Sequence, residues 1–322
     1  MNVTGKSVLV TGGAGFIGSH LVDELIARGA SKVVAVDNLF LGRRENLSAA
    51  EGAGEGFSFV ELDASDFDGM SAVIAEHGVE AVFDLAVIPL PTSLERPKWS
   101  VDVNVLITTT LCELAKAGAF ETLIHFSSSE ALGTAQQVPM SEDHPLAPTT
   151  PYAASKAAGD HIVLSYVRTF GIDASILRPF NNYGPRQNDQ AYAGIIPIVI
   201  RRIQANQAIE IFGDGFQTRD FLYATDTAAA AVSLYECPAS RGLITNVAAG
   251  RETSVNDLVA ALKRVMGAED HPVVHGPERP GDVRRHVADV GRARELFGFR
   301  PRVDPDEGLR QTVEWYVSGG GS

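Results

Sequence analysis

Short apolar runs alternate with amphipathic stretches along the first 180 residues of the chain. The apolar runs predict buried strands at 7–13, 32–37, 57–63, 81–86, 122–127 and 173–179. Helical spacing of apolar residues lies between these strands, most clearly at 18–29, 101–117 and 152–170. Strands that are apolar on both faces need helices on both sides. The alternation therefore predicts an α/β fold, a Rossmann-type doubly wound parallel sheet.

The alternation stops after the sixth predicted strand. A loop rich in Asn, Gly and Gln is followed by short apolar segments and by a helix at 254–267, which Ser254 is placed to cap. We therefore expect a large domain over residues 1–180 and a smaller C-terminal α/β region over 181–317. The second region is expected to interleave with the first, because its elements are short. The glycine-rich end, 318–322, is expected to be a disordered tail.

Composition excludes several classes of function. The 322 residues carry a net charge of −13 with scattered basic residues, so a nucleic acid is not an expected partner. No apolar run reaches the roughly 18 residues of a membrane span, and the first residues lack the layout of a signal peptide. Cys112 and Cys237 stand far apart. That spacing predicts neither a disulfide framework nor a metal site, and it fits a cytoplasmic protein.

A glycine-rich turn joins the first predicted strand to the first helix. In "TGGAGFIGSH", Gly12 permits a tight turn, Gly15 lets the backbone approach a pyrophosphate, and Gly18 lets the helix pack close to the strand. Asp37 ends the second strand, where a carboxylate accepts hydrogen bonds from an adenosine ribose and repels a 2′-phosphate. The motif predicts a dinucleotide site that favours NAD over NADP.

Tyr152 and Lys156 lie one turn apart on the helix predicted at 152–170. A phenol is a poor base at neutral pH, but a lysine ammonium and a cationic nicotinamide both favour the phenolate. Tyr152 is therefore a candidate for taking a proton from a substrate hydroxyl. The same spacing also fits an ordinary surface pair. The glycine turn and the serines at 127–129, at the end of a predicted strand, favour the catalytic interpretation.

These motifs, together with "RPFNNYGP" (178–185), resemble the extended short-chain dehydrogenase/reductases, specifically the nucleotide-sugar epimerase/dehydratase group. The resemblance runs nearly end to end and includes "GDGFQTRDFLYATD" (213–226) and "RPGDVRRHVAD" (279–289). It implies an enzyme that binds NAD tightly and recycles it while acting on a UDP- or dTDP-sugar.

The resemblance also implies how the work is divided along the chain. Residues 1–180 would bind NAD and carry the catalytic groups, and residues 181–317 would bind the nucleotide sugar. Two copies of the chain would pair through the helices near 101–117 and 152–170 to form a homodimer.

Individual roles follow from the same motifs. Ser128 would hydrogen-bond the reacting sugar oxygen, Tyr152 would be the base, and Lys156 would be its electrostatic support. The implied cofactor-binding residues are Gly12, Gly15, Phe16, Ile17, Gly18, Asp37, Asn38, Asp63, Ala64, Leu85, Ala86, Asn104, Ser127, Tyr152, Lys156 and Pro179. The implied substrate-binding residues are Ser129, Asn181, Arg219, Arg279 and Asp282. Arginine forks suit a diphosphate, which an acidic protein must bind through local positive charge.

Two positions depart from the family pattern. The family commonly has His where this chain has Asp84, and Tyr where this chain has Leu132. Asp84 either adds a carboxylate near the site or is satisfied by backbone groups at the end of its strand. Leu132 removes a phenol from the vicinity of the site.

Glu130 directs the expected reaction. After oxidation of the sugar at C4, a 4,6-dehydratase must move a proton at C5 and expel the C6 hydroxyl, and a UDP-glucuronate decarboxylase must reprotonate C5. A 4-epimerase, of the UDP-glucose or UDP-glucuronate type, needs no second acid or base. Family members with lyase activity often carry Glu two residues after the catalytic hydroxyl, as this chain does.

We therefore expect a Glu130-assisted lyase. A 4-epimerase, with Glu130 merely capping or solvating a loop, is the alternative. A non-catalytic NAD-bound sensor is a remote alternative, since Tyr152 and Lys156 are both intact.

Overall fold

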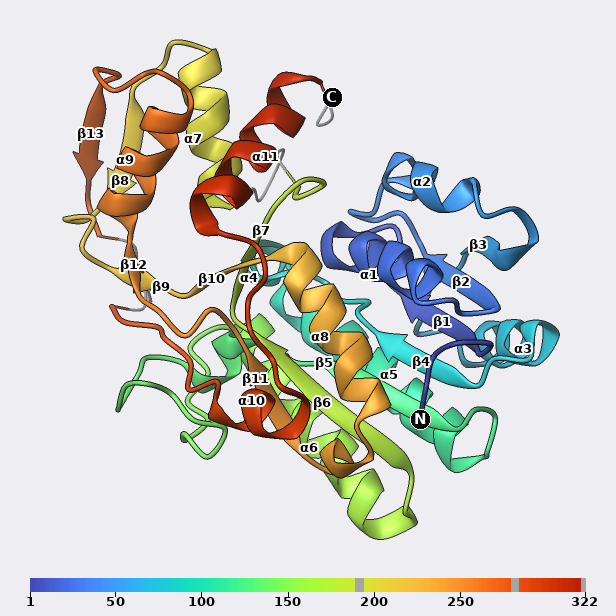
Figure 1. Ribbon diagram of the computed structural model, residues 1–322. Helices are drawn as coiled ribbons and strands as arrows, with labels where there is room; N and C mark the ends of the chain where they lie inside the picture. Colours follow the sequence, from blue (N-terminus) through green and yellow to red (C-terminus); the bar gives the residue numbers. More distant parts are fainter. Residues whose placement is uncertain (189–193, 279–283, 320–322) are drawn as a thin grey trace.

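The computed structural model describes residues 1–188, 194–278 and 284–319. Its centre is a seven-stranded parallel sheet in the order β11-β6-β5-β4-β1-β2-β3 (Figure 1). The strands are β1 (Ser7–Thr11), β2 (Lys32–Asp37), β3 (Phe57–Glu61), β4 (Ala81–Asp84), β5 (Thr122–Phe126), β6 (Asp173–Pro179) and β11 (Ile244–Val247). The predicted Rossmann-type α/β sheet is confirmed.

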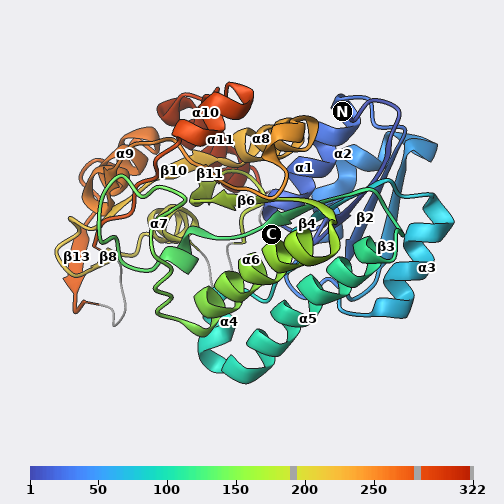
Figure 2. The same ribbon diagram turned by 90° about the horizontal axis from the view of Figure 1, so that it is seen from below.

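Helices cover both faces of this sheet, as Figures 1 and 2 show. One face carries α1 (Phe16–Ala27), α2 (Ser48–Glu51), α8 (Ala224–Glu236) and α10 (Gly291–Phe297). The other face carries α3 (Phe67–His77), α5 (Pro97–Lys116) and α6 (Pro151–Phe170), and the short α4 (Leu90–Glu95) precedes α5. Successive side chains of a strand point to opposite faces. In β1, Val8 and Val10 therefore pack with α1, while Leu9 packs with the α5 layer.

A smaller C-terminal lobe has a separate apolar core (upper left in Figure 1). Its helices are α7 (Ile195–Gln204), α9 (Val255–Val265) and α11 (Pro305–Val317). Short strand pairs accompany them: β8 (Ile209–Phe212) with β13 (Val273–Gly276), β9 (Thr218–Arg219) with β12 (Thr253–Ser254), and β7 (Asn181–Tyr183) with β10 (Phe221–Tyr223).

The chain passes between the large sheet and the lobe more than once. α8 and β11 both follow residue 180, yet α8 packs against α1 and β11 pairs with β6, Ile244 opposite Ile176. The apolar pattern does not predict β11. It is four residues long at the edge of the sheet, so its place depends on pairing with β6 rather than on a local signal.

The helix that carries Tyr152 and Lys156 begins and ends where its sequence dictates. The Thr150 hydroxyl accepts a hydrogen bond from the Ala153 N–H at 3.2 Å, and Pro151 occupies the first turn, where no N–H is needed. The helix ends at Gly171, whose φ of +71° favours glycine. Ser254 caps α9 as predicted, accepting from the Asp257 N–H at 3.0 Å.

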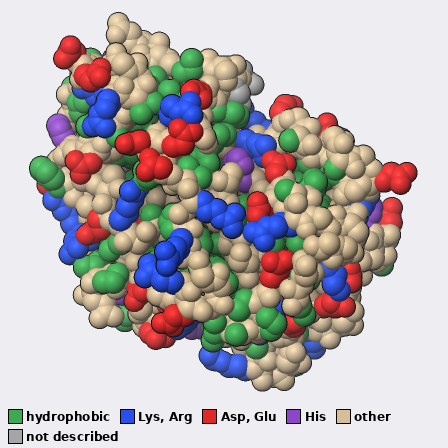
Figure 3. Space-filling model, viewed as in Figure 1, with side chains coloured by type: hydrophobic (Ala, Val, Ile, Leu, Met, Phe, Trp, Pro, Cys, Tyr) green, Lys and Arg blue, Asp and Glu red, His purple; other side chains and the backbone are tan. Residues whose placement is uncertain are grey.

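Acidic and basic side chains are interspersed over the face of the molecule shown in Figure 3. Within residues 1–188, 194–278 and 284–319, we find no helix with the length and apolar character that crossing a bilayer requires. Ser318 and Gly319 follow α11, and the rest of the predicted tail lies outside the described residues.

Candidate active site

The predicted functional residues gather at the carboxyl ends of the parallel strands. The strand order reverses between β1 and β4, and at such a point the connections leave in opposite directions and open a crevice. The glycine turn follows β1, Leu85 and Ala86 follow β4, and the serines at 127–129 follow β5. The topology therefore brings three predicted parts of the site to one edge.

The glycine turn leaves no room for side chains. Gly12 has a φ of +64°, and a Cβ atom there would lie 3.0 Å from backbone atoms of Leu85 and Ala86. A Cβ atom on Gly18 would lie 2.1 Å from the carbonyl oxygen of Gly12. Gly15 precedes α1, so the N–H groups of the first helical turn face the turn. The close approach creates a cradle in which a pyrophosphate would meet backbone donors.

A hollow of about 80 Å³ adjoins the turn. Its lining includes the predicted cofactor residues Gly12, Asp37, Asn38, Asp63, Ala64 and Ala86. Asp37 accepts from the Leu39 N–H at 2.8 Å and from the Ala14 N–H at 3.1 Å, and the Gly15 N–H is a third backbone donor. A carboxylate has about four lone-pair sites, so Asp37 can accept a further hydrogen bond. Burial raises the pKa of Asp37, and these backbone hydrogen bonds lower it. The turn and the hollow together fit a dinucleotide.

Thr11 and Asn104 hold the cofactor-facing backbone in place. The Thr11 hydroxyl accepts from the N–H groups of Leu85 and Ala86, both at 3.0 Å. The Asn104 amide accepts from the Ile88 N–H at 2.7 Å and donates to the Ile88 carbonyl and to Ser155. Both amide hydrogens of Asn104 are thus used inside the protein. Its direct contact with the cofactor stays a prediction, while its support of the loop after β4 is observed.

Ser128, Glu130 and Tyr152 converge from two elements. Ser128 caps a single 3₁₀ turn, Ser129–Leu132, and its hydroxyl accepts from the Glu130 N–H at 3.2 Å. Gly133 ends this turn at a φ of +66°, where a Cβ atom would lie 1.9 Å from a backbone oxygen. Tyr152, in the first turn of α6, is hydrogen-bonded to Ser128. The predicted hydroxyl and the predicted base are therefore neighbours, with a carboxylate beside them.

Burial is the largest influence on the pKa values of Tyr152 and Lys156. Burial raises the pKa of Tyr152 to about 12, the hydrogen bond with Ser128 lowers it, and the charge of Glu130 raises it. Burial lowers the pKa of Lys156, and the charges of Asp84 and Asp160 raise it. The phenol is therefore protonated at neutral pH, and base function requires further positive charge close to its oxygen.

The side chain of Ser127, which is predicted to contact the cofactor, belongs to a buried polar cluster. Its hydroxyl donates to Asp160 at 2.9 Å, and Arg178 donates to the same carboxylate oxygen at 2.8 Å. Asp160 is 1% exposed and Arg178 is fully buried. The ion pair anchors α6 to β6 behind the catalytic group. The contact of Ser127 with a cofactor stays a prediction.

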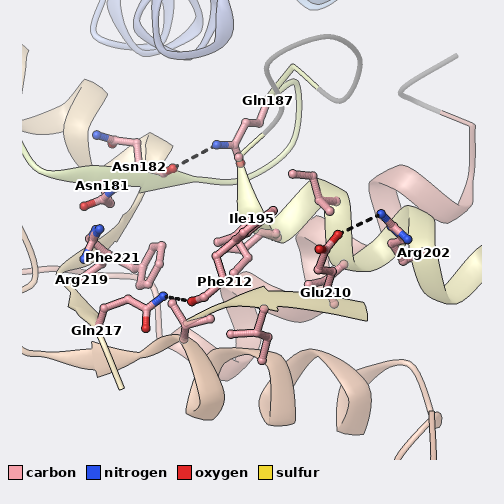
Figure 4. Close-up of a pocket in the computed structure, with 16 residues that line it drawn as sticks. Asn181, Asn182, Gln187, Ile195, Arg202, Glu210, Phe212, Gln217, Arg219 and Phe221 are labelled. Carbon is pink, nitrogen blue, oxygen red and sulfur yellow. Dashed lines mark hydrogen bonds and ion pairs between the residues drawn. The ribbon is translucent and has the colours of Figure 1, made fainter. Parts of the chain in front are cut away.

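A cavity of about 440 Å³ lies in the C-terminal lobe, where β7, α7 and β8 contribute to its lining (Figure 4). Asn181 and Arg219, predicted to bind substrate, lie at one end of it, and Arg202 and Glu210 lie at the other. The buried Oδ1 atom of Asn181 has no hydrogen-bond partner within the described residues. Ile195, Ile196, Val199, Phe212 and Phe221 contribute an apolar lining. The cavity thus combines polar groups at its ends with apolar walls, which suits a polar ligand that carries a ring.

The remaining predicted residues lie around these features. Phe16 and Ile17 begin α1 and are partly exposed, Pro179 ends β6, and Ser129 is buried in the 3₁₀ turn. Arg279 and Asp282 lie outside the described residues.

Two residues that support the site are missing from the sequence-based prediction. Thr11 is a polar side chain at the end of an apolar strand, a signal that could have identified it. Ser93 is fully buried in α4, and its hydroxyl accepts from the Tyr152 N–H at 3.2 Å. Its sequence gives no hint of this contact, because α4 and α6 meet only in the folded chain.

The two departures from the family pattern have different environments. Leu132 is fully buried in an apolar cluster with Met140 and Phe180, so it contributes packing beneath the 3₁₀ turn. Asp84 is 2% exposed. Of the two alternatives that the sequence left open for Asp84, the structure does not support backbone partners, because the side chains of Thr11 in β1 and His125 in β5 bind its carboxylate.

Sequence comparison identifies the family. The profile of the NAD dependent epimerase/dehydratase family matches residues 8–248, a span that includes the glycine turn, the 3₁₀ turn and α6. The chain belongs to this family. The predicted membership is therefore confirmed, and the protein is an NAD-dependent enzyme, which leaves the non-catalytic sensor without support.

Proteins named as 4-epimerases and proteins named as 4,6-dehydratases both match nearly the full length of this chain. A UDP-glucose 4-epimerase from Mycolicibacterium smegmatis is 41% identical over 310 residues, which cover 96% of this chain and 97% of that protein. The structure of a UDP-glucose 4-epimerase from Thermotoga maritima with UDP-glucose is 34% identical, with a TM-score of 0.90 and coverage of 97% of this chain and 99% of that one. A dTDP-glucose 4,6-dehydratase from Streptomyces venezuelae, solved with NAD, is 31% identical, with a TM-score of 0.91 and 98% coverage of both chains.

Gly18→Ala should abolish NAD binding, because the new methyl group would lie 2.1 Å from the Gly12 carbonyl oxygen and force the turn apart. The measurement is the NAD content of the purified protein together with its affinity for added NAD. Gly56→Ala is the matched control, since a Cβ atom there has its nearest neighbour at 3.8 Å. Normal NAD binding by a folded Gly18→Ala protein would show that the turn does not hold the cofactor.

Proposed function

We propose that the protein oxidises C4 of a UDP- or dTDP-sugar transiently and then performs a Glu130-assisted lyase step at C5 and C6. The step is decarboxylation of UDP-glucuronate or 4,6-dehydration of a nucleotide hexose. The observation that carries this proposal is the position of Glu130 in the 3₁₀ turn that Ser128 caps, where its charge also contributes to the raised pKa of Tyr152. An ionisable carboxylate beside the base is what the lyase step requires and what C4 oxidation alone does not.

The residues of the chain divide the proton chemistry between them. Ser128 holds the sugar oxygen, and Tyr152 removes its proton. When bound, NAD supplies the hydride acceptor and a positive charge near Tyr152. Lys156, behind Tyr152 on α6, adds a second positive charge to the site. The C4 ketone makes the C5 proton acidic. In a dehydration Glu130 would take that proton and pass it to the C6 hydroxyl, which leaves as water, and in a decarboxylation Glu130 would return a proton to C5 after CO₂ has left. The hydride would then return to the sugar, so that NAD is recycled.

The cavity in Figure 4 is the proposed site for the nucleotide diphosphate. Arg219 brings a guanidinium group to the end that Asn181 shares, and the Asn181 amide N–H groups are the ones that can donate to a phosphate oxygen. The apolar wall that includes Phe212 suits a pyrimidine ring. In this proposal residues 1–180 bind NAD and carry catalysis, residues 181–317 bind the nucleotide sugar, and Arg279 and Asp282 complete that site.

A homodimer through α5 and α6 is part of the proposal. These helices pack together on one face of the sheet, and Leu106 on α5 is 50% exposed. A two-fold axis beside them would bring two copies of the helix pair into one four-helix contact. We also place the protein in the cytoplasm, where its two cysteines, which form no disulfide, would stay reduced.

A 4-epimerase is the second candidate. The observation that favours it is the 41% identity with the Mycolicibacterium smegmatis UDP-glucose 4-epimerase, compared with 34% for a dTDP-glucose 4,6-dehydratase from an Actinoplanes species. An epimerase would use Ser128, Tyr152 and Lys156 in the same way and leave Glu130 without a chemical role.

Glu130→Gln should preserve oxidation at C4 and block the lyase step. Glutamine keeps the shape of glutamate but cannot exchange a proton, and loss of the Glu130 charge removes one factor that raises the pKa of Tyr152. Incubation with UDP-glucose, dTDP-glucose or UDP-glucuronate should therefore leave reduced nicotinamide on the enzyme, detected by its absorbance. Product formation should fall by ~10²–10⁴-fold, the usual contribution of a general acid or base.

Product masses distinguish the reactions in the same assay. Wild-type enzyme should release a product that has lost water or CO₂, and Tyr152→Phe should give neither product nor reduced nicotinamide. A wild-type product of unchanged mass with inverted C4, or full lyase activity in Glu130→Gln, would favour the epimerase.

Arg219→Ala should raise KM with a much smaller change in kcat, because a group that binds the diphosphate interacts equally with substrate and transition state. Each charge-assisted hydrogen bond lost is worth about 1.5–3 kcal/mol. Arg202→Ala is the control, since Arg202 lines the same cavity but lies 3.8 Å from Glu210 in an ion pair. A collapsed kcat with unchanged KM would contradict the assignment.

Leu106→Arg should convert a dimer into a monomer, because a charge at the centre of an apolar contact would be buried without a partner. Light scattering at micromolar concentration measures the mass of each form. Val274→Arg, at a 49% exposed position on β13 in the other lobe, should leave the mass unchanged. A monomeric wild-type protein would rule out the proposed interface.

A further inference from the structure

The segment that follows β7 runs between α1 and the C-terminal lobe (Figure 1). Nε2 of His20, on α1, lies 3.0 Å from the Pro185 carbonyl oxygen. The carboxylate of Asp23, on the same helix, lies 2.7 Å from the Arg186 guanidinium. His20 and Pro185 are 165 residues apart in the chain, so only folding brings them together. The helix that follows the glycine turn is thus fastened to the segment at two successive residues.

The next residue of the segment, Gln187, reaches the cavity of Figure 4. Its side chain lines this cavity, and its Nε2 donates to the Asn182 carbonyl at 3.3 Å. Asn182 lines the same cavity. On the opposite side, the Gln187 carbonyl accepts from the Tyr316 hydroxyl of α11. Residues 185–187 therefore connect α1, the wall of the cavity and α11.

His20 is a neutral hydrogen-bond donor in this arrangement. It is 8% exposed, and burial, followed by the charge of Arg186, lowers the pKa of His20 to about 4. The ring is therefore uncharged at neutral pH and carries a single N–H. A carbonyl oxygen only accepts, so this hydrogen lies on Nε2 and points at the Pro185 carbonyl. The imidazole thus holds the backbone of the segment in one direction.

The backbone of Arg186 depends on support of this kind. Its φ of +67° lies in the left-handed region, which residues other than glycine rarely adopt. Such a residue keeps its conformation only where its surroundings hold it. The ion pair with Asp23 holds the side chain, which is 17% exposed, and the hydrogen bond from His20 holds the preceding carbonyl. Both contacts come from α1, so this helix holds the path of residues 185–187.

We propose that His20 and Asp23 are positioning residues for the nucleotide-sugar cavity, because they hold residues 185–187 in place from α1. Neither side chain lines the cavity. They would act through Gln187 and Asn182, whose places in the cavity wall depend on the path of the segment. This inference rests on the proposed function, which puts the nucleotide diphosphate in this cavity. It gives two residues of the helix after the cofactor turn a role in binding the other ligand.

The first test is the binding of a nucleoside diphosphate to NAD-saturated protein, measured by isothermal titration calorimetry. The probe is UDP or dTDP, whichever the wild type binds more tightly. Asp23→Asn should weaken its binding by about two- to fivefold, the range for a partly exposed ion pair. Affinity for NAD, measured separately, should stay at the wild-type value. A general loss of stability would not separate the two ligands in this way.

Glu24→Gln is the matched control. It removes a carboxylate from the next position of α1, where Glu24 pairs with Arg28 of the same helix at 2.8 Å, so binding of the probe should not change. The exchange of charges in Asp23→Arg with Arg186→Asp re-forms the pair with reversed signs. The double variant should recover affinity that each single change loses, because the two residues act on each other.

His20 is tested by a pair of variants. His20→Leu removes the donor and should weaken binding of the probe by about two- to tenfold, the usual contribution of one hydrogen bond. In His20→Gln, the amide N–H can still donate to the Pro185 carbonyl, so affinity should return toward the wild-type value. Recovery by glutamine identifies the hydrogen bond, rather than packing of the ring, as the property that matters.

Unchanged binding of the probe in folded Asp23→Asn and His20→Leu would overturn the proposal. An equal loss of affinity for NAD and for the probe would also overturn it, because the variants would then disturb α1 as a whole. Arg219→Ala separates this inference from the proposed function. Normal binding of the probe by Arg219→Ala would remove the cavity assignment itself, whereas weakened binding by Arg219→Ala beside unchanged α1 variants would overturn only the role of His20 and Asp23.

Discussion

Burial of a lysine ammonium is the constraint around which the catalytic half of the molecule is arranged. Lys156 lies in the layer between the sheet and α6, where removal of water favours the neutral amine. The fold opposes this with a backbone carbonyl at the end of β5 and with carboxylates from β4 and α6. Each of these groups brings polar partners of its own. The result is a polar cluster inside a core that is otherwise built from aliphatic side chains.

The same polar cluster also joins strands of the sheet to the helices that cover it. Arg178 joins β6 to α6 through Asp160, and Ser127 donates to the same carboxylate from the end of β5. Asn104 joins α5 and α6 to the loop after β4. The polar side chains around Lys156 therefore also hold α6, the helix that carries Tyr152, against the sheet. A site that transfers protons needs both properties, because rate depends on pKa and on position together.

The relatives of this chain show why the fold does not choose the reaction. Structures of an epimerase and of a dehydratase superpose on it with TM-scores of 0.90 and 0.91. The shared scaffold holds the glycine turn, Tyr152 and the cavity beside Arg219, and in our proposal these suffice for oxidation at C4. What happens next depends on which groups stand beside the reacting carbon atoms, so a single side chain such as Glu130 carries more information about the reaction than the whole sheet.

The sequence by itself determined β1 to β6 of the sheet, the glycine turn and the spacing of Tyr152 and Lys156. Each depends on local spacing: continuous apolar runs, glycines at fixed intervals, and two residues one helical turn apart. Only the tertiary structure decided what surrounds them. Asp84 and His125 are 41 residues apart in the chain, and neighbouring parallel strands bring them within 2.8 Å. Ser93 and Tyr152 meet in the same way, as do β6 and β11. Such contacts depend on long-range packing, which leaves no periodic mark in a sequence. For the same reason the sequence left two alternatives open for Asp84, and only the fold showed that side chains from adjacent strands bind its carboxylate.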